Sequence, residues 1–295
     1  MPEPTPPRTI LCATDLSSRC DRALDRAALL ARHWQAQLVV VHALQTATEF
    51  IEARRLHDLP SWRRPEDRAH VVARQLRADM IDPDSRAAVV VEEGEPTELI
   101  LGEAERWQAD LIVTGVARNE LFGRRLLGTT VDTLIRGAGA PVLVVRERAR
   151  RPYERVVVAT DFSDGSRHAL HAALRLFGAA DLTLFHASRT MTGGLVDQGR
   201  VRDGWQAVAR QDAETFLDAA RLPADLRSRL RLLVEQGDPE WLLRDYVEAA
   251  GVDLVVAGTR GRGAVLGLLL GSTAKRLADG LSCDVMVEPA PRKST

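Results

Sequence analysis

The sequence predicts an α/β protein built as two tandem doubly wound domains, each a five-stranded parallel sheet flanked by helices. Two observations support this fold class. Short apolar runs alternate with longer amphipathic stretches along the chain, as expected for buried strands joined by helical crossovers. The same landmarks also occur twice in the same order, which indicates that one structural unit has been duplicated.

The repeat is clearest where residues 13–24 align with 159–170, at an offset of 146, with six of the twelve positions identical. Two homologous domains are therefore predicted, 1–148 and 152–295, which meet near an arginine-rich stretch. Later matches follow as the offset falls to 143: His42-Ala43 with His186-Ala187, Gly94-Glu95-Pro96 with Gly237-Asp238-Pro239, Asp110–Gly115 with Asp253–Gly258, and Gly128-Thr129-Thr130 with Gly271-Ser272-Thr273.

In the second copy, the strands are predicted from short runs that are rich in Val and Leu and bounded by Gly, Pro or Asp. In an open parallel sheet, ligands bind beyond the carboxyl ends of the strands, where the strand order reverses. The loops after the first and fourth strands are therefore the predicted ligand site. The predicted strands are 155–160, 181–187, 230–235, 253–258 and 284–288, and the predicted helices are 166–177, 203–220 and 239–250, the last with Pro239 in its first turn.

The bulk composition excludes several classes of protein. With 295 residues, 45% of them hydrophobic and 27% charged, the chain resembles a folded protein with room for two cores. A net charge of −1 gives no reason to expect nucleic acid or an anionic membrane as partner. No apolar run approaches the roughly 20 residues that span a bilayer, and no signal peptide is recognisable. The three cysteines are too scattered for a disulfide framework or a zinc site, so a cytoplasmic location is expected.

The fourth loop of the second copy contains a candidate phosphate site. Gly258 and Gly261 let a ligand approach the backbone closely, and the stretch Gly271-Ser272-Thr273 opens a predicted helix. Free N–H groups and the helix dipole there favour an anion, and the two hydroxyls add donors. Each glycine alone is more typical of an ordinary loop, and the Ser/Thr pair is typical of an ordinary helix cap, but the whole set favours binding. A lysine-based phosphate loop is excluded in the first copy, because the only lysines are Lys275 and Lys293.

The spacing Gly-x2-Gly-x9-Gly-Ser, together with Ala159-Thr160-Asp161 at the end of a strand, resembles the universal stress protein family in its tandem form. The resemblance covers essentially the whole chain. It implies a five-stranded parallel sheet and an adenine-nucleotide partner, namely ATP with or without magnesium. The residues that it assigns to nucleotide binding are Ala159, Thr160, Asp161, Ala187, Ala257, Gly258, Arg260, Gly261, Gly271, Ser272 and Thr273.

Within that set, the resemblance implies that Asp161 contacts the nucleoside and that Ala187 lines the adenine pocket. Arg260 and the two glycines beside it would lie along the ribose and phosphates, and Gly271 to Thr273 would bind the phosphate chain. The first copy departs from the pattern, because Arg118 stands where the second glycine belongs. Either this arginine fills the pocket, or it turns outward and a phosphate still binds. Weakened or altered binding in the first copy is the favoured interpretation, with one ATP per chain.

Other candidate residues have mainly structural interpretations. Asp15 and Asp161 are equally consistent with magnesium ligands or general bases and with caps of the following helices. His42 and His186 occupy matching strand ends and are expected to be hydrogen-bonded structural residues. Cys12 is expected to be a small buried apolar residue.

No catalytic residues are recognisable, so at most slow ATP hydrolysis is expected. The favoured hypothesis is a nucleotide-dependent stress or signalling module. The alternatives are a slow ATPase or another nucleotide-using α/β enzyme, and a scaffold that binds no nucleotide. The family resemblance also predicts that the last strands, 142–145 and 284–288, pair with each other, so that one chain imitates a dimer. Whether whole chains form a further homodimer is left open.

Overall fold

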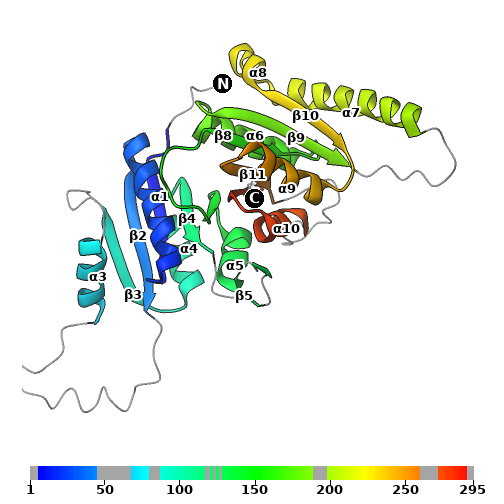
Figure 1. Ribbon diagram of the computed structural model, residues 1–295. Helices are drawn as coiled ribbons and strands as arrows, with labels where there is room; N and C mark the ends of the chain where they lie inside the picture. Colours follow the sequence, from blue (N-terminus) through cyan, green and yellow to red (C-terminus); the bar gives the residue numbers. More distant parts are fainter. Residues whose placement is uncertain are drawn as a thin grey trace, which may run out of the picture.

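Ten strands form one continuous sheet in the computed structural model (Figure 1). The structure describes residues 6–44, 68–79, 87–116, 120–121, 124–125, 128–188, 198–259 and 272–290. We call residues 6–146 half one and residues 152–290 half two. The strand order is β10-β9-β8-β11-β12-β7-β4-β1-β2-β3, so each half contributes one block of five strands.

Half one carries a small hairpin in addition to its five sheet strands. This hairpin, β5 (Glu120–Leu121) with β6 (Arg124–Arg125), lies in the loop between the fourth sheet strand and the last helix. The other elements of half one are β1 (Thr9–Ala13), α1 (Ser18–Trp34), β2 (Gln37–Leu44), α3 (Arg68–Asp79), β3 (Ala88–Glu93), α4 (Pro96–Arg106), β4 (Leu111–Gly115), α5 (Thr129–Gly137) and β7 (Val142–Val145).

Half two repeats this order, and its described residues include a short helix, α8, after α7. Its elements are β8 (Arg155–Ala159), α6 (Asp164–Phe177), β9 (Asp181–Ser188), α7 (Gln198–Ala220), α8 (Ala224–Arg229), β10 (Arg231–Gln236), α9 (Pro239–Ala250), β11 (Leu254–Gly258), α10 (Ser272–Gly280) and β12 (Asp284–Glu288). All five predicted strands are confirmed, and α9 has the predicted bounds. Helix α6 begins earlier than predicted because the Ser163 hydroxyl accepts a hydrogen bond from the Ser166 N–H and caps the helix.

The strand order confirms the doubly wound topology. Within each half the strands are parallel, and the first strand lies between the second and the fourth. The order therefore reverses between β8 and β11 in half two, and between β1 and β4 in half one. These are the points where a parallel sheet binds ligands, beyond the carboxyl ends of the strands.

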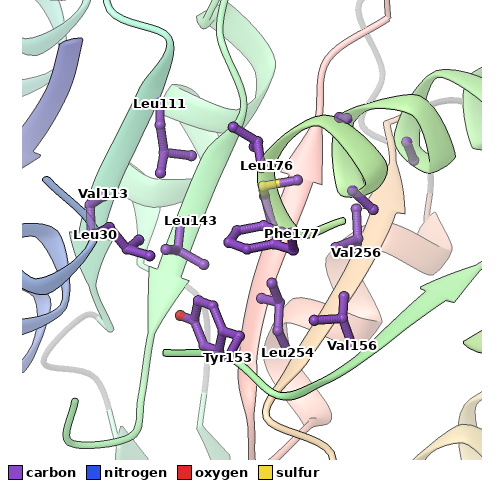
Figure 2. Close-up of a cluster of buried hydrophobic side chains, with 14 of the residues drawn as sticks. Leu30, Leu111, Val113, Leu143, Tyr153, Val156, Leu176, Phe177, Leu254 and Val256 are labelled. Carbon is purple, nitrogen blue, oxygen red and sulfur yellow. The ribbon is translucent and has the colours of Figure 1, made fainter. Parts of the chain in front are cut away.

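Each face of the sheet is covered by one layer of helices that runs through both halves. One apolar core contains side chains of α1, α3, α6 and α7, and the other contains side chains of α4, α5, α9 and α10. Figure 2 shows the first core, where residues of half one such as Leu30 and Leu143 meet residues of half two such as Phe177 and Leu254. Because these cores cross the junction, burial of apolar surface stabilises the contact between the two halves as well as the fold of each half.

The junction itself is an antiparallel pairing of β7 with β12, which confirms the predicted pairing of the last strands. Leu143 lies opposite Met286, and these two residues are equivalent in the repeat, at the offset of 143. A pseudo-twofold axis therefore passes between them. The halves form an isologous pair within one chain, in which each surface meets its own counterpart.

Candidate functional site

The turn after the first strand has the same unusual backbone in both halves. Leu16 has φ of 61° and Phe162 has φ of 62°, a left-handed conformation that is strained for bulky side chains. A threonine hydroxyl holds each turn in place: Thr14 Oγ1 accepts from the Leu16 N–H at 3.0 Å, and Thr160 Oγ1 accepts from the Phe162 N–H at 2.9 Å. Sequence reasoning missed these two positions, because nothing in a Leu or Phe signals a positive φ.

The strand-end aspartates organise the same turns rather than capping the helices. Asp15 Oδ1 accepts from the Ser17 N–H at 2.9 Å, and Asp161 Oδ1 accepts from the Ser163 N–H at 3.1 Å. The N-cap positions are occupied by the two serines, which corrects the alternative that the aspartates themselves cap α1 and α6. Asp15 is exposed and Asp161 is half-buried, so each carboxylate lies at the carboxyl edge of the sheet.

The matching histidines tie the second strand to this turn. His42 Nδ1 lies 2.8 Å from the Thr14 carbonyl oxygen, and His186 Nδ1 lies 2.8 Å from the Thr160 carbonyl oxygen. A carbonyl oxygen only accepts, so Nδ1 carries the proton in both rings. The His186 ring also stacks on Phe162, with centroids 4.2 Å apart. These contacts support the structural role that the sequence favoured for the histidines.

Three of the candidate nucleotide-binding residues of half two lie on one face of the sheet. Ala159, Ala187 and Ala257 come from the neighbouring strands β8, β9 and β11, and all three pack in the core that contains α9 and α10. Asp161 follows two residues after the end of β8. Small side chains at three neighbouring strand ends suit the close approach of a flat ligand. The residues present therefore fit an adenine ring beside a hydrogen-bonding carboxylate.

Thr160 and Gly258 have structural roles that the sequence did not anticipate. The Thr160 hydroxyl donates to Ser166 Oγ at 2.8 Å, so this buried side chain anchors the first turn of α6. A Cβ at Gly258 would lie 2.6 Å from the backbone oxygen of Gly165 in α6. Glycine is needed at this position because the helix packs directly on the strand, whether or not a ligand approaches from elsewhere.

The phosphate end of the candidate site is only partly described. Helix α10 begins at Ser272, as predicted, and Ala274, Leu277 and Ala278 pack in the same core as the three alanines. The start of this helix therefore lies on the same side of the sheet as the proposed base pocket. Arg118, Arg260, Gly261 and Gly271 lie outside the residues that the structure describes.

The cysteine thiols of the protein are protected. Cys12, Cys20 and Cys283 are all buried. Burial raises the pKa of the Cys20 thiol to about 11 and that of Cys283 to about 12, and it also raises the pKa of Cys12. A protonated thiol is a poor nucleophile and a poor metal ligand, which agrees with the predicted role of Cys12 as a small apolar residue.

Comparison with known proteins agrees with the repeat. The sequence model of the universal stress protein family matches residues 7–146 and 152–289. A universal stress protein of Mycolicibacterium smegmatis is 28% identical over 298 residues, which cover 94% of this chain and 96% of that protein. A universal stress protein of Thermus aquaticus is 32% identical over 139 residues, which cover 47% of this chain and 98% of that protein.

Solved structures share the fold over nearly the whole chain. A functionally unknown protein from Pseudomonas aeruginosa PAO1 superposes with a TM-score of 0.64 at 20% identity, covering 97% of this chain and 94% of that one. A universal stress protein from Archaeoglobus fulgidus gives a TM-score of 0.62 at 18% identity, covering 95% and 98%. Among the described helices, none combines the length and apolarity required to cross a membrane. The chain belongs to the universal stress protein family, as a tandem of two such domains.

Proposed function

We propose that half two binds ATP at the carboxyl ends of β8, β9 and β11, and that the protein is a nucleotide-dependent stress or signalling module. One observation supports this proposal above all. Small residues from three neighbouring strands share a face of the sheet at the point where the strand order reverses, and α10 begins on that same side.

The described residues offer suitable chemistry for each part of the nucleotide. The face formed by Ala159, Ala187 and Ala257 suits a flat, largely apolar base. The Asp161 carboxylate accepts hydrogen bonds and is held in place by the Ser163 N–H, so it suits a ribose hydroxyl. The first N–H groups of α10 and the dipole of this helix favour phosphate. The proposed ligand is ATP, with or without magnesium.

The experiment is a calorimetric titration of the full chain with ATP, with and without magnesium. We expect an affinity on the order of micromolar and a stoichiometry of one. Replacing Gly271 with Trp should abolish binding, because the indole would occupy the space before the phosphate-binding helix. The matched control is Gly128→Trp, at the equivalent position of half one, which should leave this affinity unchanged.

Undiminished ATP binding by a folded Gly271→Trp variant would show that the assigned pocket is wrong. The same preparation distinguishes a binding module from an enzyme. Phosphate release at an ordinary enzymatic rate, about 10 per second, would replace the module with an ATPase.

A further inference from the structure

The seam between the halves contains a charge reversal at a single repeat position. Asp132 in α5 and Lys275 in α10 are equivalent in the repeat, at the offset of 143. Lys275 Nζ lies 3.5 Å from Asp132 Oδ1, so this position meets its own counterpart across the pseudo-twofold axis. Figure 1 shows the two helices side by side. In a pair of identical halves, the same position would place two like charges together.

The reversal recurs one helical turn later. Arg136 of α5 is equivalent to Asp279 of α10, again at the offset of 143. Arg136 Nε also lies 3.0 Å from Asp132 Oδ2 within its own helix. Two successive turns of these helices therefore carry opposite charge in the two halves. The halves have diverged into complementary surfaces at the place where a symmetric dimer would have identical ones.

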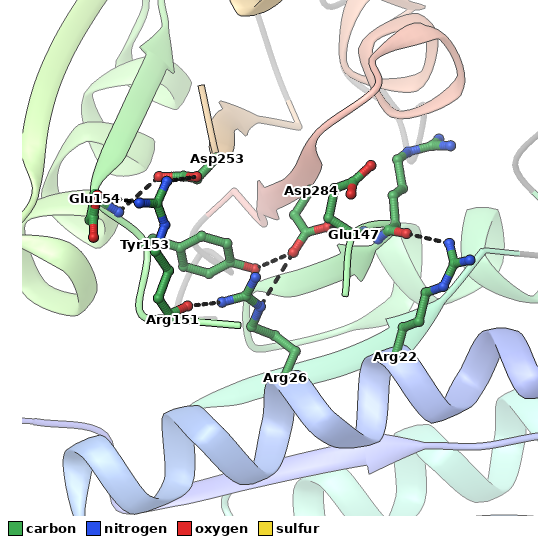
Figure 3. A network of polar contacts seen from close by, with 9 residues as sticks. Arg22, Arg26, Glu147, Arg151, Tyr153, Glu154, Asp253 and Asp284 are labelled. Atoms are coloured by element: carbon green, nitrogen blue, oxygen red, sulfur yellow. Dashed lines mark hydrogen bonds and ion pairs between the residues drawn. The ribbon is translucent and has the colours of Figure 1, made fainter. Parts of the chain in front are cut away.

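The opposite face of the sheet carries a second, buried asymmetry (Figure 3). The side chain of Asp284, at the start of β12, is completely buried. Its carboxylate accepts from Tyr153 Oη at 2.6 Å and from the backbone N–H groups of Arg146 and Glu147 at 2.7 and 2.9 Å. Arg26 of α1 in half one completes the site, with its Nε 3.5 Å from Asp284 Oδ2.

Arg26 is also confined to this site. It is 5% exposed, its guanidinium lies 4.0 Å from the centre of the Tyr153 ring, and it donates to the Arg151 carbonyl oxygen at 2.8 Å. Burial raises the pKa of the Asp284 carboxyl, and the Glu147 N–H, the Tyr153 hydroxyl, the Arg146 N–H and the Arg26 guanidinium all oppose that shift. The pair therefore depends on both members being present.

Neither member of the Arg26–Asp284 pair occurs at the equivalent position of the other half. The equivalent of Arg26 in half two is Ala172, at the offset of 146, and the equivalent of Asp284 in half one is Pro141, at the offset of 143. Two copies of half two would thus bury each Asp284 against an alanine. Two copies of half one would bury each Arg26 against a proline. Only a pair made of one half one and one half two places the Arg26 guanidinium beside the Asp284 carboxylate.

We propose that the surface formed by β7 with α1 and α5, and that formed by β12 with α6 and α10, are specific for each other. Each accepts the other kind of half and rejects its own kind. The chain therefore closes on itself or exchanges halves with a second copy, and it does not pair like with like.

The test starts from the full chain with a protease site inserted between Ala149 and Arg150, folded intact and then cut. The cut protein is mixed with a cut sample that is isotopically heavy, at a urea concentration at which half of the pairs are dissociated. The urea is then removed so that the halves pair again. Native mass spectrometry resolves mixed pairs from both kinds of like pair. We expect light and heavy halves to exchange freely and like pairs to remain below about one in a hundred.

Variants separate charge complementarity from simple loss of packing. Asp132→Lys and Lys275→Asp should each raise the fraction of like pairs at least threefold, and the double exchange should restore the original distribution. Arg26→Ala combined with Asp284→Ala should raise that fraction at least tenfold. Arg106→Ala, at an exposed position on α4, is the control and should change nothing. Like pairs at statistical proportions in the unmodified protein would overturn the proposal, and so would a double exchange that fails to restore specificity.

Discussion

Half one and half two share the turn that follows the first strand and differ around it. Both keep the threonine, the aspartate and the histidine that hold a left-handed residue in place. They differ in the sequence of the fourth loop, where Arg118 of half one stands in the place of Gly261, and at the seam, where equivalent positions carry opposite charges. The comparison teaches that the duplicated scaffold was retained because its strained turn needs several partners together, whereas loops and contact surfaces were free to diverge.

Smaller differences follow the same pattern. Ser163 caps α6 with its hydroxyl, whereas Ser17 occupies the same position before α1 without a side-chain cap bond. Glu288 ends β12 where half one has Val145. Ala257, on the floor of the proposed pocket, is replaced by the buried Thr114 in half one. Each difference can be exchanged between the halves, which makes the comparison testable.

The largest expected effect concerns Arg118 and Gly261, which both lie outside the described residues. Gly261→Arg should weaken ATP binding in half two about a hundredfold, or roughly 2.7 kcal/mol, because an arginine side chain would fill the space beside the nucleotide. Arg118→Gly should create or improve a site in half one. Calorimetric stoichiometry and affinity measure both changes.

The control for this exchange is Gly102→Arg, since the space around Gly102 is open, and it should leave ATP binding unchanged. Two equivalent ATP sites in the unmodified protein would contradict the asymmetry altogether.

A second, smaller effect concerns the pH dependence of stability. Burial raises the pKa of the Glu288 carboxyl to about 7, against the opposing effect of Arg175. Unfolded glutamate has a pKa of about 4.3, so the folded chain binds more protons than the unfolded chain between these values. The free energy of unfolding should therefore fall as pH rises from about 4 to about 7, by roughly 2 kcal/mol once partial exposure is discounted.

Glu288→Val, which copies Val145, should remove the Glu288 part of this fall when urea unfolding is measured from pH 5 to pH 8, and it should leave the part contributed by the buried Asp284. Glu248→Gln, at an exposed position on α9, should retain it. If the Glu288→Val variant keeps the full slope, another group is responsible for it.

The smallest effect should distinguish the two helix starts. Ser163→Ala removes a hydroxyl that accepts from the Ser166 N–H at 3.3 Å, and it should cost about 1 kcal/mol. Ser17→Ala removes no such bond and should cost less than half as much. The free energy of unfolding is measured from the urea midpoint, with an unchanged dependence on urea concentration. Equal losses of this free energy at the two serines would mean that the caps do not differ in solution.

Much of the fold could be predicted because it depends on local patterns. The predicted strands 155–160 and 253–258 have buried centres, 156–158 and 254–257, and buried parallel strands have a strong sequence signature. Pro239 marked the start of α9, and the structure adds that Asp238 caps this helix by accepting from the Trp241 N–H at 2.9 Å. Helix α8 and the hairpin were not predicted, because elements of a few residues have too little periodicity to stand out.

The candidate site was predictable in outline but not in detail. Repeated motifs located it after the first and fourth strands, and the strand order confirms that these ends are neighbours. The left-handed Phe162 and the packing role of Gly258 were not visible. Both depend on atoms that approach from another element, such as the Gly165 oxygen, and the chain alone does not specify such an approach.

By itself the sequence determined that the protein is a duplicated α/β unit, because strand hydrophobicity and repeat spacing are properties of short segments. It also located the asymmetry between the motif loops, since Arg118 and Gly261 occupy matching positions. Only the tertiary structure decided that Asp132 meets Lys275 and that Arg26 meets Asp284. Those partners lie more than a hundred residues apart, and their charges acquire meaning only when β7 and β12 pair and bring the two surfaces into contact.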